Sequence, residues 1–187
     1  MQKILMKICF LLAGCFLNPS LQSLPYSLPC GSHFVAGVDL GSGILELEDG
    51  SQWQISRQNI RQLHGWSREC LEVPVEITPN YCSNSYTYCI THEDTGSCAK
   101  ANLIKAPRRD NPYAVTILAI DKNRYNFGTI HLSNGTSWHV NFRELEGIRH
   151  WYLDDLIIIG KNTEWFSWNS HILINIHTNT FVRAQRL

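Results

Sequence analysis

The stretch LEDGSQWQIS, residues Leu47–Ser56, returns later in the chain as LSNGTSWHVN, residues Leu132–Asn141. A fixed offset of 85 residues aligns the two stretches, and the match continues on both sides of them. The pairs that keep this offset include Leu45 and Ile130, Trp53 and Trp138, Ile60 and Leu145, and Trp66 and Trp151. A constant spacing over this many chemically similar positions indicates an internal duplication.

Each copy of the repeated stretch is typical of a β-hairpin. Alternating apolar residues flank Asp49–Gly50 in the first copy and Asn134–Gly135 in the second. These dipeptides favour tight primed turns, which need positive φ at their centre, so we expect such a turn in each half. The tryptophans that recur at matched positions are predicted to fill the core of each half: Trp53, Trp66, Trp138 and Trp151.

Further short runs with strand character follow each hairpin. They cover residues 70–77, 86–91 and 97–104 in the first half, and 155–160, 171–176 and 180–184 in the second. Asn141 followed by Glu144 fits a capping box and favours a short helix after the second hairpin. With about five short strands and at most one short helix per half, the sequence predicts a mainly β protein of two homologous small β-barrel, SH3-like domains in tandem. We expect a cysteine-rich domain at 24–104, a linker at 105–112 and a cysteine-free domain at 113–187.

The N-terminal residues have the order of a secretory signal peptide. Lys3 and Lys7 precede an apolar run, Ile8–Leu17, and a polar segment follows it. This run is well short of the roughly 20 residues that a membrane-spanning helix needs, so we expect residues 1–23 to be removed on export, leaving no transmembrane span. The alternative is lipidation of Cys15, because LAGC at 12–15 resembles the lipobox of bacterial lipoproteins.

The charge balance argues against polyanionic partners. Without residues 1–23 the chain has 14 basic and 16 acidic residues, a net charge of −2. Nucleic acids and anionic membrane surfaces are therefore not expected as partners.

The five remaining cysteines all lie in the first half: Cys30, Cys70, Cys82, Cys89 and Cys98. Small exported domains are commonly stabilised by disulfides. If residues 92–95 form a hairpin loop, Cys89 lies directly opposite Cys98, which predicts a disulfide between them. Cys70 and Cys82 are candidates for a second, with Cys30 left over. A zinc site made by Cys82, Cys89, His92 and Cys98 is the less favoured alternative, because the spacing lacks paired C-x2-4-C knuckles.

No arrangement typical of an active site is found, so we predict no catalytic residue, metal or cofactor. The eight histidines are scattered, and the sequence contains no HExxH, GxSxG or phosphate-binding glycine motif. The best candidate for recognition is the cluster Trp165, Phe166 and Trp168, since exposed aromatic residues make good platforms for sugars or peptides. The alternative is that this cluster closes a barrel or packs the two domains together.

The duplicated [DN]-G-[ST]-x-W hairpin, followed by W-x2-[DE], resembles small β domains of exported bacterial proteins of uncharacterised function. A looser similarity is to bacterial SH3-like modules, which bind cell-wall peptide or glycan. We therefore expect an exported, non-enzymatic binding or structural protein of the bacterial envelope or extracellular space, with an envelope protein or a cell-wall glycan as partner. The alternatives are a peptidoglycan- or glycan-binding module and a periplasmic hydrolase that uses histidine and aspartate residues.

Overall fold

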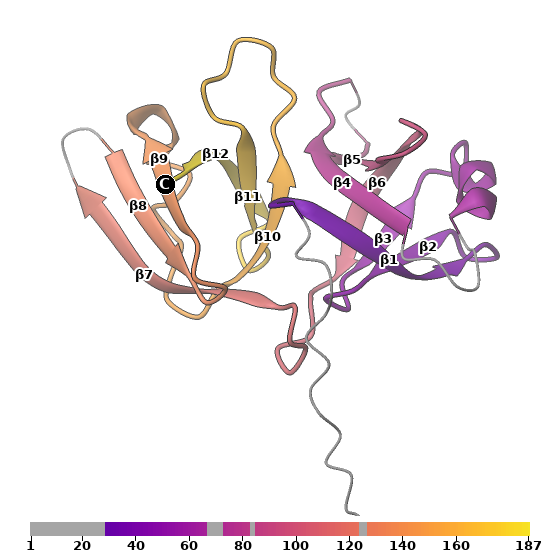
Figure 1. Ribbon diagram of the computed structural model, residues 1–187, viewed down its shortest axis with the longest axis horizontal. Coiled ribbons are helices and arrows are strands. Elements are labelled where there is room, and N and C mark those ends of the chain that lie inside the picture. The colour runs from indigo at the N-terminus through magenta and orange to yellow at the C-terminus, as the bar shows by residue number, and fades with distance from the viewer. Residues whose placement is uncertain (1–28, 67–72, 83–84, 124–126) are drawn as a thin grey trace, which may run out of the picture.

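The structure of this chain is a computed structural model that describes residues 29–66, 73–82, 85–123 and 127–187. It consists of two closed, six-stranded antiparallel β-barrels in tandem, which lie side by side (Figure 1). The predicted fold class, a mainly β protein with two small barrels, is confirmed. The signal peptide at 1–23, and with it Cys15, lies outside the described residues.

The two barrels have the same strand order. The first is built from β1 (Ser32–Asp39), β2 (Ile44–Leu47), β3 (Gln52–Ile55), β4 (Val73–Pro79), β5 (Tyr88–His92) and β6 (Cys98–Lys105), paired in the order β1-β2-β3-β6-β5-β4. The second is built from β7 (Val115–Asn123), β8 (Phe127–Leu132), β9 (Ser137–Asn141), β10 (Leu156–Lys161), β11 (His171–Asn175) and β12 (Thr180–Arg186), paired in the order β7-β8-β9-β12-β11-β10. Matching topology supports the duplication read from the sequence.

Each barrel has one strand more than the five expected, and the addition is its first strand. β1 and β7 lack a clean alternation because each has a bulge where it pairs with the next strand. The register shifts between Val35 and Gly37 in β1, and between Ile117 and Ala119 in β7. A bulge inserts one residue and reverses the alternation of inward and outward side chains, which hides the period of two.

Among the described residues, helical structure is limited to two short 3-10 helices, η1 (Ile60–Gly65) and η2 (Phe142–Glu144). The Asn141 side chain does cap η2, accepting a hydrogen bond from the Arg143 amide at 3.2 Å. Glu144 does not complete a capping box. Its carboxylate instead accepts a hydrogen bond of 2.6 Å from the Arg183 guanidinium of β12.

The repeated hairpin turns are not the primed turns we expected. In both, the glycine amide bonds back to the leucine three residues earlier, and only the glycine has positive φ, 82° at Gly50 and 79° at Gly135. This is a three-residue loop made of a type I turn followed by a left-handed glycine. Because Asp49 and Asn134 keep negative φ, their side chains are free to accept the amide hydrogens of Ser51 and Thr136.

The same turns explain the tryptophans of the repeat. The indole Nε1 of Trp53 donates to Ser51 Oγ at 2.9 Å, and that of Trp138 donates to Thr136 Oγ1 at 2.8 Å. A buried indole needs such an acceptor. The motif [DN]-G-[ST]-x-W therefore encodes a turn and the hydrogen-bond partner of the core tryptophan next to it.

Strands β10 and β11 of the second barrel are buried on both faces. Ile157, Ile159 and Leu173 point into their own barrel core, whereas Ile158 and Ile172 belong to the cluster of the first barrel. Two-sided burial explains why these strands read as continuous apolar runs. The equivalent strands β4 and β10 pack so closely that a Cβ on Gly160 would clash with the Ile77 carbonyl oxygen.

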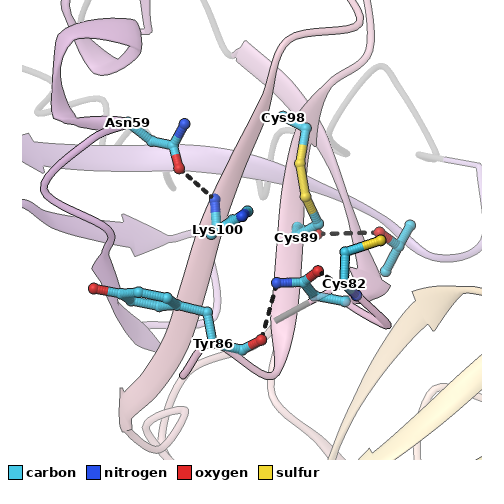
Figure 2. The surroundings of a disulfide bond; sticks show 8 residues. Asn59, Cys82, Tyr86, Cys89, Cys98 and Lys100 are labelled. Atoms are coloured by element: carbon cyan, nitrogen blue, oxygen red, sulfur yellow. Dashed lines mark hydrogen bonds between the residues drawn. A yellow bond between two sulfur atoms is a disulfide. The ribbon is translucent and has the colours of Figure 1, made fainter. Parts of the chain in front are cut away.

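Cys89 and Cys98 form a disulfide on the outer face of the first barrel (Figure 2). The expected register is wrong by two residues. Cys89 pairs with Lys100 and Cys98 with Thr91, so the disulfide runs diagonally between β5 and β6. The loop begins one residue later than predicted because His92 still pairs, its amide donating to the Ser97 carbonyl. A shift of two preserves the face of each side chain, which is why the two cysteines still meet.

Among the described residues, no other cysteine forms a disulfide. Cys82 is exposed and Cys30 is half-buried, and neither is bonded to another described cysteine. The predicted pairing of Cys82 with Cys70 falls on a residue outside the described part of the chain. In the second barrel, the positions equivalent to Cys89 and Cys98 hold Ile172 and Phe181, which pack against the first barrel.

Candidate functional site

The loop between β10 and β11, residues 162–170, carries the aromatic cluster that the sequence singled out. The side chains of Trp165, Phe166 and Trp168 are 90, 92 and 96% exposed. The loop projects beyond the strand ends, on the side opposite the segment that joins the barrels (Figure 1). At such exposure the three rings contribute neither to a barrel core nor to the contact between barrels. Apolar patches of this kind usually mark interaction sites.

Hydrogen bonds close the base of this loop, and a turn in which the Ser167 amide donates to the Glu164 carbonyl spans Trp165 and Phe166. The Asn162 amide donates to the Ser170 carbonyl at 3.0 Å, and Asn162 Nδ2 donates to the Asn169 carbonyl at 2.7 Å. Asn162 Oδ1 accepts from the Glu164 amide at 3.1 Å. The aromatic residues are therefore held on a fixed base.

Arg183 of β12 ties the base of the loop to both barrels. Its guanidinium pairs with Glu144 at 2.6 Å and with Glu164 of the loop at 2.7 Å. Burial alone would lower the pKa of Arg183, but contacts with Glu144 and with Tyr81 raise it. Tyr81 is exposed and belongs to the β4–β5 loop, the counterpart of the aromatic loop in the first barrel. Loops from the two barrels thus meet at one guanidinium.

The four tryptophans predicted to be core residues are placed in the interior. Trp53, Trp66, Trp138 and Trp151 are each at most 3% exposed. The indole of Trp151 donates to Thr180 Oγ1 at 3.2 Å, so it has a partner as Trp53 and Trp138 do. None of the four is presented to a ligand.

A cleft of about 310 Å³ lies between the barrels, and the repeated turns of both halves line it. Glu48 and Asp49 come from the first turn, and Ser133 and Asn134 from the second. The two copies differ here, since the first contributes two acids and the second contributes two neutral side chains. Burial raises the pKa of Asp49, although His33 and the contacts with Ser51 oppose this shift.

His33 is the charged centre of this cleft. Its Nδ1 lies 2.8 Å from Glu48 Oε1, and its Nε2 lies 2.8 Å from the carbonyl oxygen of Ile159 in β10. Both partners are acceptors, so both contacts are hydrogen bonds only when the ring is an imidazolium. Burial would lower the pKa of His33, but the Glu48 carboxylate, with Asp49 and the Ile159 carbonyl, raises it to about 9.

This arrangement suits a structural cation that joins the barrels. A general base needs a free ring nitrogen and a pKa near the operating pH, and His33 has neither. No local sequence pattern marks this group, because Glu48 and Ile159 lie 15 and 126 residues from His33. The His33–Glu48 pair also depends on β1, the strand that the sequence did not predict because a bulge interrupts its alternation.

The structure also bears on the alternative zinc site. Two of its four proposed ligands, Cys89 and Cys98, form the disulfide. Across the described residues, no group of three or more histidine, cysteine, aspartate or glutamate side chains is placed to hold a metal ion.

A scan against protein-family models, a search of curated proteins and a search of solved structures each find no match to this chain. Within the part of the chain that the structure describes, no helix has the length and apolarity required to span a bilayer.

Proposed function

We propose that this chain is an exported, non-enzymatic binding protein of the bacterial envelope or the extracellular space, and that its β10–β11 loop contacts the ligand. The observation that carries the proposal is the nearly complete exposure of Trp165, Phe166 and Trp168 on a loop with a fixed base. Leaving large aromatic side chains in water is unfavourable, so an uncovered cluster points to a surface that is covered when the protein works.

Two features support export. The first is the basic, apolar and polar order of residues 1–23, and the second is the Cys89–Cys98 disulfide, a bond that persists mainly in oxidising compartments. Intact mass measurement of the protein recovered from the periplasm or medium tests this. We expect an N-terminus near residue 24 and a mass gain of two hydrogens per disulfide on reduction. A lipid-modified Cys15 would instead support the anchored alternative.

The alternatives differ in what covers the loop. A peptidoglycan or glycan ligand would stack its sugar rings on the indoles. A periplasmic hydrolase is the weaker proposal, because His33 has no ring nitrogen available for proton transfer.

The test compares the secreted protein with its Trp165→Ala/Trp168→Ala variant in pull-downs against peptidoglycan, lipid vesicles and purified envelope proteins. The matched control is Tyr152→Ala/Leu153→Ala, which removes two other exposed apolar side chains of the second barrel. We expect only the tryptophan variant to lose binding while its thermal melt stays close to wild type. Equal binding by all three proteins would refute the proposal, and so would unfolding of the tryptophan variant at a much lower temperature.

A further inference from the structure

We infer that the three aromatic side chains insert together into the interfacial region of a lipid bilayer whose headgroups carry no net charge. This inference rests on the proposed role of the β10–β11 loop and names its ligand class. Trp165, Phe166 and Trp168 form the inserted tip, and Tyr81 lies beside the base of the loop.

The exposure of the rings favours insertion over stacking. A ring that serves as a platform for a flat ligand rests one face on the protein, so that face is covered. Here each of the three residues is at least 90% exposed, so neither face of its ring rests on the protein. Such rings gain most from a medium that surrounds them. The bilayer interface does so, and tryptophan and tyrosine are enriched there.

The charges around the loop point to an uncharged surface. No charged residue occurs from 165 to 170, and Arg183 and Lys161 at the base of the loop are paired with carboxylates. Arg186, whose charge acts on His171 at the start of β11, is exposed. Arg183 Nε lies 2.7 Å from Glu164 Oε2, and Lys161 Nζ lies 3.6 Å from Glu76 Oε1. With Arg183 and Lys161 offset by carboxylates and no charge on its tip, the loop offers little attraction to anionic headgroups, so apolar burial supplies most of the binding.

The size of the patch argues against a protein partner. Three aromatic side chains offer roughly 450–750 Å², whereas each side of a stable protein interface buries about 800 Å². The tip of the loop extends beyond the ends of β10 and β11 (Figure 1). Interfacial elements commonly bury their apolar side only about 5–10 Å deep, a depth that a loop tip reaches.

The experiment measures co-sedimentation of the secreted protein with phosphatidylcholine vesicles. We expect binding that is nearly equal at 0.1 and 0.5 M NaCl, and equal again when phosphatidylglycerol is added. Trp165→Ala/Trp168→Ala should weaken binding about 100-fold, roughly tenfold for each indole removed, while Tyr152→Ala/Leu153→Ala should leave it unchanged. Lipids brominated near the headgroup should quench indole fluorescence in the wild type and not in the tryptophan variant.

Several results would overturn the inference. These are no binding at millimolar lipid, equal binding by the tryptophan variant, or binding that needs phosphatidylglycerol and is lost at high salt. A wild-type dimer that the tryptophan variant converts to a monomer would assign the loop to a second copy of the chain. If vesicles fail but peptidoglycan or an envelope protein binds only with Trp165 and Trp168 intact, the lipid inference fails and the proposed function stands. If every pull-down is independent of the tryptophans, both fail.

Discussion

The buried His33 pair predicts that the protein loses stability as the pH rises from 6.5 to 9. The folded state raises the pKa of His33 to about 9 from an unfolded value of 6.5. A raised pKa means that the folded protein holds the proton more tightly. The stabilisation is therefore complete below pH 6.5 and is lost as the pH rises through 9. A difference of this size corresponds to at most about 3 kcal/mol, at about 1.4 kcal/mol per pH unit.

The assay is denaturant unfolding at pH 6, 7, 8 and 9 for the wild type and His33→Gln. The free energy of unfolding of the wild type should fall by about 2–3 kcal/mol over this range, which is equivalent to a decrease in Tm of roughly 5–10 °C for a chain of this size. His33→Gln removes the titrating group, so this fall should be absent from its profile. Glu48→Gln serves as the matched variant, because it removes the main cause of the raised pKa and should also flatten the profile.

Other groups titrate with a different sign or at a different pH. Burial lowers the pKa of His171, so its contribution increases as the pH rises towards 6.5, before the His33 contribution is lost. The difference between wild type and variant therefore isolates His33. The reasoning would be refuted if the unfolding free energy of His33→Gln fell with pH as steeply as that of the wild type. An NMR titration that gives His33 a pKa near 6.5 would also refute it.

Three further predictions concern stability. Ser51→Ala leaves the buried indole N–H of Trp53 without an acceptor and should cost about 1–3 kcal/mol in urea unfolding, whereas no loss would contradict the role assigned to the motif. Cys89→Ala/Cys98→Ala opens a loop with a sequence separation of 9 and should cost about 2.5 kcal/mol, a loss that reductant should reproduce in the wild type alone. Gly160→Ala places a methyl group against a β4 carbonyl oxygen and should destabilise the protein by about 1–3 kcal/mol, and a Tm equal to wild type would show that the barrels separate easily.

The repeat and its hairpins could be predicted because they are local. The Asp-Gly and Asn-Gly signals, the alternating residues and the matched tryptophans all lie within a few residues of one another. The first strand of each barrel escaped detection because its bulge breaks the alternation at Ala36 and Leu118. The disulfide could be predicted although the expected register of β5 and β6 was wrong. A shift of two residues keeps Cys89 and Cys98 on the same face of the sheet.

The two candidate sites also differ in whether their residues are neighbours in the sequence. Trp165, Phe166 and Trp168 could be singled out because they are adjacent in the chain and have no matching aromatic run in the other half apart from the tyrosines of 81–88. The cleft could not be predicted, since its lining joins the two turns, the start of β1 and strand β10. Such a site depends on how the barrels pack, and no local pattern records that.

Two-sided burial of β10 and β11 has a thermodynamic consequence for the duplicated halves. Each half closes its own hydrogen-bonded barrel, yet Ile158, Ile172 and Ile174 of the second half belong to the apolar cluster of the first. Separating the halves would expose that shared surface to water, so neither reaches its full stability alone. Two copies in the sequence thus form one cooperative folding unit, in which a defect in either barrel lowers the melting temperature of both.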